Sequence, residues 1–161
     1  MQADIVRAAA GLLDRLRAEK LRLACAESCT GGLIAAALTE IPGSSDVFER
    51  GFVTYSNQAK SDVLGVPESI IARHGAVSRE VALLMAKGAL TRSPADLAVA
   101  VTGIAGPGGG KAGKPVGLVH IAAVRKGGQA RHRECRFGDV GREVIRLNSV
   151  AAAFALIGEL L

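Results

Sequence analysis

A carboxylate, a hydroxyl and a thiol stand side by side in Ala26–Gly32 (AESCTGG), the stretch best suited to chemistry in this chain. An apolar run that reads as a buried strand, Leu21–Cys25, precedes it, and an apolar run that reads as a helix, Leu33–Leu38, follows. Small polar residues and paired glycines let the backbone turn sharply and approach a ligand. The first N–H groups of a helix are unpaired and suit an anion or a developing oxyanion. The alternative, a commoner role, is that Ser28 or Thr30 only caps the helix.

Two further stretches have the same character, because polar or flexible residues follow an apolar run. Tyr55–Lys60 (YSNQAK) contains the only tyrosine and a lysine five residues later, and Thr102–Gly110 (TGIAGPGGG) supplies many unhindered N–H groups. In open α/β sheets, ligands gather at the carboxyl ends of strands. A serine, a tyrosine, a lysine and a set of N–H groups could therefore converge there. Taken singly, Tyr55 would be an ordinary residue at a strand end, Lys60 a solvated lysine and the glycines a mobile connection.

Helices and strands alternate along the chain. Apolar spacing predicts a first helix to about Ala18 and a last one over about 140–160, and Ser78 fits the N-cap of a helix that ends near Leu90. The remaining expectations are a second helix ending near Glu40, short helices after Asn57 and Pro67, strands over 21–25, 47–55 and 95–102, and a hairpin of 116–124 with 129–136. Gly51 is expected to break or bulge its strand. This order predicts an α/β fold with a mixed sheet and helices on both faces.

Composition restricts the class of protein. The 161 residues fit one domain, and no apolar run approaches the roughly 20 residues of a membrane span. The N-terminus predicts an amphipathic helix rather than a signal peptide, so we expect a cytoplasmic protein. The net charge of +5 comes from scattered residues, and one Tyr, four Phe and no Trp argue against nucleic acid as partner. Three cysteines without metal-site spacing predict neither a disulfide framework nor a zinc site.

The three stretches together resemble the C-terminal domain of the competence/damage-inducible CinA family, whose stand-alone members are nicotinamide-nucleotide amidohydrolases. The matching segments, in the family's order, are Ala26–Gly32, Tyr55–Lys60, Thr102–Gly110, Lys114–Val119 (KPVGLV) and Arg142–Arg146 (REVIR). The resemblance covers nearly the whole chain. It implies one three-layer α/β/α domain over residues 1–161, with a mixed, mostly parallel sheet. It also implies a homodimer without metal or cofactor, and without the N-terminal pyrophosphatase-type domain of longer members.

The resemblance further implies hydrolysis of the carboxamide of nicotinamide mononucleotide to nicotinate mononucleotide and ammonia. Ser28 would be the nucleophile, Lys60 its base, and Tyr55 a proton relay or a support for both. Lys60 would need its pKa lowered by about 2–3 units from ~10.4 to act as a base. N–H groups of Cys29–Gly31 are the candidate oxyanion donors. Cys29 competes with Ser28, because a thiol is intrinsically the better nucleophile, but the resemblance favours serine.

The residues expected to bind substrate lie in the same segments. They are Glu27, Cys29, Thr30, Gly31, Thr102, Gly103, Ala105, Gly106, Gly108, Arg142 and Arg146. The glycine-rich loop and the two arginines would receive the 5′-phosphate, although Glu27 could be structural and the arginines could pair with nearby acids. Where family members often carry a Thr-Pro-Glu type of segment, this chain has Lys111-Ala112-Gly113. Two alternatives stay open: a non-catalytic module that binds a nucleotide or partner, and, ranked last, a nucleic-acid-binding accessory protein.

Overall fold

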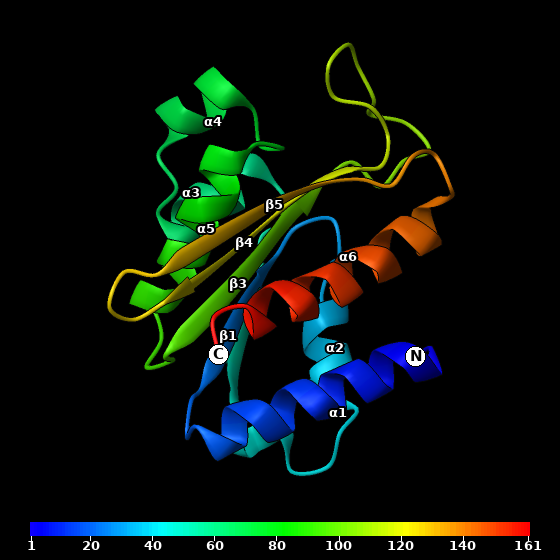
Figure 1. The fold of residues 1–161 in the computed structure, drawn as a ribbon. Helices are drawn as coiled ribbons and strands as arrows, with labels where there is room; N and C mark the ends of the chain where they lie inside the picture. The colour runs from blue at the N-terminus through cyan, green and yellow to red at the C-terminus, as the bar shows by residue number, and fades with distance from the viewer.

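A single five-stranded sheet between two layers of helices forms the body of the molecule (Figure 1). The computed structural model describes residues 1–161. The elements are α1 (Ala3–Ala18), β1 (Leu23–Glu27), α2 (Leu33–Thr39), the 3-10 helix η1 (Ser44–Asp46), β2 (Phe48–Val53), α3 (Asn57–Leu64), α4 (Glu68–His74), α5 (Arg79–Thr91), β3 (Leu97–Gly103), β4 (Leu118–Arg125), β5 (Ala130–Arg136) and α6 (Arg142–Gly158). None of these helices is long and apolar enough to cross a membrane.

The order of the strands places three loops at one edge of the sheet. The order is β2-β1-β3-β4-β5, with β1 parallel to both β2 and β3, and with β4 and β5 antiparallel to their neighbours. The carboxyl ends of the three parallel strands therefore meet. The segments that leave these ends are 28–32, 54–56 and 104–117. They contain or adjoin the three stretches that the sequence singled out.

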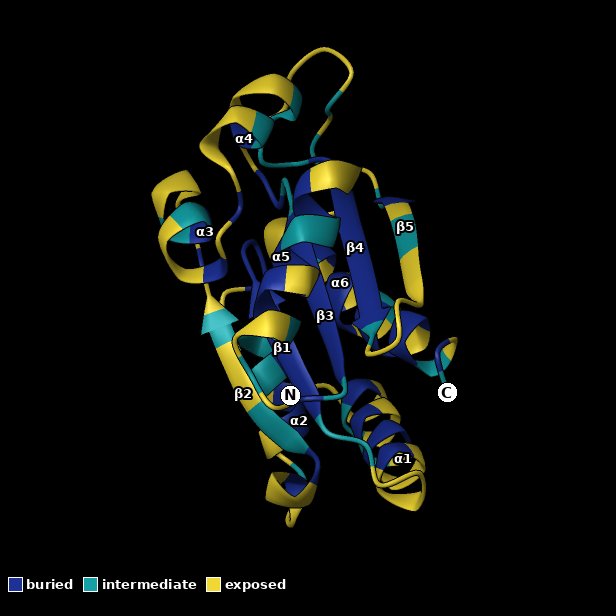
Figure 2. Ribbon diagram, turned by 90° about the vertical axis from the view of Figure 1, so that its left-hand side faces the viewer, coloured by how far each residue is buried: buried dark blue, intermediate teal, exposed yellow.

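The two faces of β3 have different side chains and pack against different helices. Leu97, Val99 and Val101 belong to the core shared with α1, α2 and α6. The intervening Ala98 and Ala100 belong to the core shared with α5. Their small size lets α5 lie close to the sheet. Figure 2 shows β1, β3 and β4 buried between the helical layers, while the edge strands β2 and β5 carry exposed residues. Strands buried on both faces read as continuous apolar runs, and this is why β1 and β3 were recognisable.

The predicted α/β fold, with a mixed sheet and helices on both faces, is confirmed. The expected irregularity at Gly51 is displaced. The register shifts between Leu23 and Ala24, which pair with Phe48 and Arg50, whereas Gly51 pairs regularly with Cys25. A Cβ atom on Gly51 would lie 3.1 Å from the Cys25 Sγ atom. Glycine is thus present to leave room for the neighbouring strand's side chain rather than to break the strand.

Candidate active site

Ser28 is the first residue after β1, and hydrogen bonds to both neighbouring strands hold the backbone around it. Its N–H donates to the Val101 carbonyl on β3 (3.0 Å). On the other side, the Thr54 N–H donates to the Glu27 carbonyl (2.9 Å). These bonds extend the parallel pairing past the ends of the strands. The Ser28 side chain therefore leaves a rigid backbone and lines a cavity at the sheet edge.

Lys60 reaches Ser28 from α3. The Ser56 side chain caps this helix by accepting the Ala59 N–H (3.0 Å). Side chains on a helix lean toward its N-terminus, which brings Lys60 back toward the sheet. Only 1% of Lys60 is exposed, and its Nζ lies 3.0 Å from both Ser28 Oγ and the Thr54 carbonyl oxygen. Burial lowers the pKa of the Lys60 amine, because desolvation disfavours the charged form.

Cys29 also lines the cavity, but its thiol is poorly suited to attack. Burial raises the pKa of Cys29 to about 12, with Arg146 and Lys60 lowering it only in part. The thiolate is the reactive form, and at neutral pH a thiol with this pKa is protonated. Cys29 is therefore a poor nucleophile. The pair that the geometry favours for nucleophilic chemistry is therefore Ser28 with Lys60.

Two backbone N–H groups beside Ser28 have no acceptor in the protein. They belong to Cys29 and Thr30. The third expected donor, Gly31, is already used, because its N–H donates to the Ser28 carbonyl (3.0 Å). Of the two, Cys29 lines the cavity whereas Thr30 is fully buried, so the Cys29 N–H is the available oxyanion donor of this turn.

The loop after β3 forms the opposite wall of the cavity. Four of its N–H groups, at Ala105, Gly106, Gly108 and Gly109, have no acceptor in the protein. The cavity has a volume of about 280 Å³. It is lined by Ser28, Cys29, Tyr55, Asn57, Lys60, Ala76, Val77, Thr102, Gly103, Ile104, Ala105, Gly106, Gly108, Gly109 and Arg142. Free N–H groups on a loop without bulky side chains suit a phosphate.

Arg142, at the start of α6, joins this loop to the tyrosine. Its Nη1 donates to the Gly106 carbonyl (2.7 Å) and its Nη2 to the Tyr55 hydroxyl oxygen (3.0 Å). Tyr55 is 61% exposed and stands at the cavity mouth. The structure thus brings together the predicted Ser28, Lys60, Tyr55 and Arg142 with the glycine loop.

Four other predicted residues do not line the cavity: Glu27, Thr30, Gly31 and Arg146. Glu27 is fully buried and accepts the N–H groups of Gly32, Ile34 and Ala35, so its carboxylate serves the start of α2. Arg146 donates to the carbonyl groups of the turn after Ser28. Thr102 does line the cavity, but its hydroxyl already donates to the Ala76 carbonyl (2.9 Å).

The cavity also contains residues that were not among the predicted site residues: Asn57, Ala76, Val77 and, within the glycine-rich loop, Ile104 and Gly109. Asn57 lies on the first turn of α3, one turn before Lys60, and that helical spacing could have indicated it. Ala76 and Val77, between α4 and α5, carry no polar group that marks them, and only packing brings them to the site.

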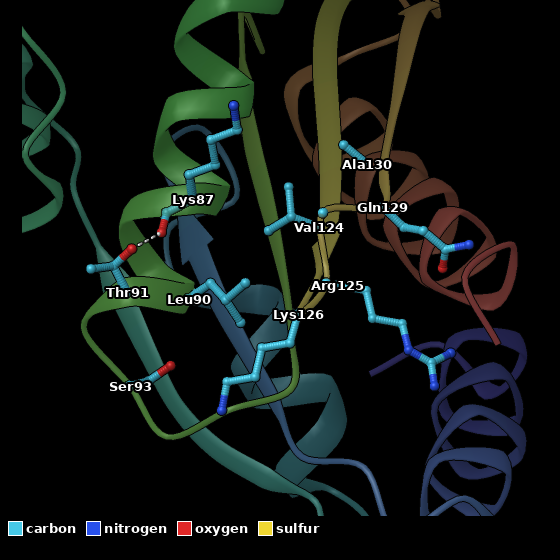
Figure 3. Close-up of a pocket in the computed structure, with 11 residues that line it drawn as sticks. Lys87, Leu90, Thr91, Ser93, Val124, Arg125, Lys126, Gln129 and Ala130 are labelled. Atoms are coloured by element: carbon cyan, nitrogen blue, oxygen red, sulfur yellow. Dashed lines mark hydrogen bonds between the residues drawn. The ribbon is translucent and has the colours of Figure 1, made fainter.

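A larger cavity of about 460 Å³ lies at the opposite end of the sheet, between α5 and the β4–β5 hairpin (Figure 3). It contains three cations, Lys87, Arg125 and Lys126. Figure 3 shows that these side chains point in different directions, with Arg125 directed toward the helices of the other layer, where it donates to the Leu160 carbonyl. The cations do not converge on one point. Chemistry therefore favours the smaller cavity, and no group of three or more His, Cys, Asp or Glu side chains in the chain is arranged to hold a metal ion.

Comparison with known proteins agrees with this architecture. The family described as the CinA C-terminal domain matches residues 6–161. This chain belongs to the CinA C-terminal domain family. A solved family structure, the competence/damage inducible protein CihA from Agrobacterium tumefaciens, has 54% sequence identity and a TM-score of 0.97, over 99% of this chain and 97% of that one.

Curated relatives of the family fall into two lengths. A nicotinamide-nucleotide amidohydrolase PncC from Enterobacter agglomerans is 53% identical over 88% of this chain and 84% of its own length. A CinA-like protein from Syntrophobacter fumaroxidans is 52% identical over 92% of this chain but only 34% of its own length. This chain spans 28 to 37% of the longer relatives that it matches.

Proposed function

We propose that this protein is an amidohydrolase that converts nicotinamide mononucleotide to nicotinate mononucleotide and ammonia through a serine–lysine pair. The observation that carries the proposal is the 3.0 Å contact between Ser28 Oγ and the buried Lys60 Nζ. A buried lysine with a lowered pKa, facing a hydroxyl in a cavity, is an arrangement suited to nucleophilic catalysis. The name of the PncC relative points to the same reaction.

In the first half of the reaction, neutral Lys60 accepts the Ser28 hydroxyl proton while the Ser28 oxygen attacks the carboxamide carbon. The Thr54 carbonyl accepts an N–H of Lys60 and thereby directs the amine lone pair at Ser28. The N–H group of Cys29, which lines the cavity, receives the developing oxyanion. Protonated Lys60 then gives its proton to the leaving nitrogen, so that ammonia departs and an acyl-Ser28 ester remains.

In the second half, Lys60 is neutral again and removes a proton from water. That water attacks the acyl-Ser28 carbon, and the same Cys29 N–H group stabilises the second tetrahedral intermediate. Collapse of the intermediate breaks the bond to Ser28 Oγ, which recovers its proton from Lys60. The product leaves as the carboxylic acid, which loses its remaining proton to solvent and becomes the carboxylate, and the enzyme returns to its starting state without a cofactor.

We assign substrate recognition to the cavity wall opposite Ser28, which the loop after β3 forms. The loop N–H groups at Ala105, Gly106, Gly108 and Gly109 and the Arg142 guanidinium provide donors for a 5′-phosphate. Tyr55, held by Arg142, sits where it can guide the substrate ring toward Ser28 or relay a proton. The positive pyridinium of nicotinamide mononucleotide makes its carboxamide more electrophilic. This reduces the transition-state stabilisation that the protein must supply.

The test is ammonia release and nicotinate mononucleotide formation from nicotinamide mononucleotide, measured with and without a chelator. We expect turnover by the wild type in both conditions. Ser28→Ala and Lys60→Met should each lower kcat by roughly 10³-fold or more, because both members of such a pair act as a unit. Cys29→Ala should keep kcat within about threefold, since the thiol is protonated at neutral pH.

Lys87→Met, a change of an exposed lysine at the other end of the sheet, is the matched control for Lys60→Met. An inactive wild type, or a fully active Ser28→Ala variant, contradicts the proposal. Binding of the nucleotide without turnover supports the non-catalytic module instead.

A further inference from the structure

Asn57 carries the only side-chain carbonyl oxygen among the residues that line the catalytic cavity, and no carboxylate lines it. The neighbours of Asn57 on the chain use their side chains within the protein. The Ser56 hydroxyl accepts the Ala59 N–H, and the Gln58 amide donates to Asp62. The exposed Asn57 amide has no hydrogen-bond partner in the protein, so both its donor and its acceptor are free for a ligand.

The helix α3 places Asn57 next to the amine of Lys60. This helix begins just beyond the carboxyl end of β2, at the edge of the sheet that holds Ser28 (Figure 2). Residues three apart on a helix share a face, and their side chains lean toward the N-terminus of the helix. The Lys60 side chain therefore extends back toward the first turn, which Asn57 occupies, and both residues line the same cavity. Asn57 is thus a neighbour of the amine that lies 3.0 Å from Ser28 Oγ.

A carboxamide brings two N–H donors to this part of the cavity. In the proposed reaction its nitrogen must face Lys60, which gives it a proton, while its oxygen faces the Cys29 N–H. The cations and free loop N–H groups of the wall are donors and cannot accept the N–H groups of the substrate. The Thr54 carbonyl beside Lys60 already accepts from the amine (3.0 Å). The side-chain acceptor that remains beside Lys60 is Asn57 Oδ1.

We propose that Asn57 is a specificity residue that recognises the primary carboxamide: its Oδ1 accepts one N–H of the substrate's NH₂ group and turns the leaving nitrogen toward Lys60. The inference rests on the proposed amidohydrolase function. An ester of the same acid has no N–H to offer, so it gains nothing from this acceptor. Asn57 therefore favours the amide over the ester, whereas the Ser28–Lys60 pair attacks both.

The experiment measures kcat/KM for nicotinamide mononucleotide and for the methyl ester of nicotinate mononucleotide. The ester forms the same acyl-Ser28 intermediate and releases methanol, whose oxygen takes the proton from Lys60. Asn57→Leu should lower the amide-to-ester ratio of kcat/KM by roughly 3- to 15-fold, the effect of one lost hydrogen bond. Asn57→Asp keeps an acceptor, so its ratio should stay within about twofold of the wild type. The ratio cancels any change common to both substrates, such as an altered pKa of Lys60.

Gln58→Leu is the matched control, because Gln58 is the next residue of α3, is exposed and does not line this cavity. It should leave the ratio unchanged. An unchanged ratio in Asn57→Leu overturns the inference alone. Equal losses for amide and ester also overturn it, because they assign Asn57 to the sugar or to the packing of α3. A ratio in Asn57→Asp as low as that in Asn57→Leu overturns it as well. A wild type that does not hydrolyse the amide overturns the proposed function and, with it, this role of Asn57.

Discussion

The side chain on which the proposed chemistry depends is a lysine that water barely reaches. At the residue scale, Lys60 replaces solvent with two partners, Ser28 Oγ and the Thr54 carbonyl, and neither is an anion. Desolvation of the ammonium therefore outweighs the opposing effect of Cys29, and the pKa of Lys60 falls. A group that serves as a base in this way lowers the stability of the folded state whenever it is protonated.

The consequence is a linked pH dependence of activity and stability. The unfolded chain holds the Lys60 proton up to about pH 10.5, whereas the folded chain releases it at lower pH. Between those two pKa values the unfolded state binds more protons, so the wild type gains stability as pH rises and loses it as pH falls. We expect kcat/KM to rise with pH and to reach a plateau below pH 10.5. As pH is lowered through the same window, Lys60→Met should become more stable relative to the wild type, measured as unfolding free energy.

Denaturant titrations at a series of pH values, beside a pH–rate profile, measure both effects. Lys87→Met should show no such pH-dependent difference, because that lysine is exposed. A difference between Lys60→Met and the wild type that is constant across pH contradicts a lowered Lys60 pKa.

At the scale of elements, the position of α3 decides whether Lys60 can reach Ser28. The end of α3 packs on α5 at Gly88, where an added Cβ would lie 2.1 Å from the Leu64 carbonyl oxygen. No side chain fits between a helix and the backbone of its neighbour at that distance. Gly88 is therefore the residue that permits α3 to lie close enough to the sheet for its lysine to be buried.

Gly88→Ala should push α3 outward and displace Lys60. We expect a loss of about 1–3 kcal/mol of stability from overpacking, together with a fall in kcat. Gly11→Ala is the matched control, because Gly11 lies within α1 and an added Cβ meets nothing within 4 Å. There the helix preference of alanine should raise stability by about 1 kcal/mol without changing kcat. Thermal unfolding and steady-state kinetics on both variants give the answer, and a Gly88→Ala variant with normal kcat contradicts this role of α3.

At the scale of the whole molecule, the second half of the sheet carries a pair of titrating groups that do not line the cavity. His120 on β4 and His132 on β5 lie with Nδ1 and Nε2 2.9 Å apart. Desolvation is the largest cause that lowers the pKa of His120, and the charge of His132 is the next. The pKa of His132 is lowered by desolvation and then by Arg79. Glu80 and Glu134 oppose these effects for both histidines, and Lys114 adds to the lowering for His120.

Folded-state pKa values below 6.5 mean that the unfolded chain takes up these protons first on acidification. The stability from the neutral pair is complete above about pH 6.5 and declines as pH falls through the folded pKa values, by at most about 1.4 kcal/mol per pH unit for each histidine. His132→Gln should flatten the dependence of unfolding free energy on pH between about 7 and 5. Denaturant titrations check this, and an unchanged slope contradicts it.

A homodimer stays a prediction at this scale, which light scattering can test.

Local patterns in the sequence determined most of the elements and their order. The apolar period of α1 and α6, the N-cap at Ser78, the buried runs of β1 and β3, and the glycine turn of the β4–β5 hairpin are properties of neighbouring residues. Short-range sterics and hydrogen bonding decide them, so the sequence suffices. Ser28 was indicated in the same way, because it follows a strand directly and precedes a helix.

Only the tertiary structure decided which polar side chains meet and which do not. Ser28 and Lys60 are 32 residues apart, and their contact exists because β1 and β2 are adjacent and α3 is buried. The Glu27 carboxylate accepts N–H groups at the start of α2, and Arg146, from the far end of the chain, donates to the turn after Ser28. The hydrophobic period and the composition of a segment determine its local secondary structure. They do not determine the packing between distant segments, and that packing buries Lys60 and gives Arg142 and Arg146, one turn apart on α6, different hydrogen-bond partners.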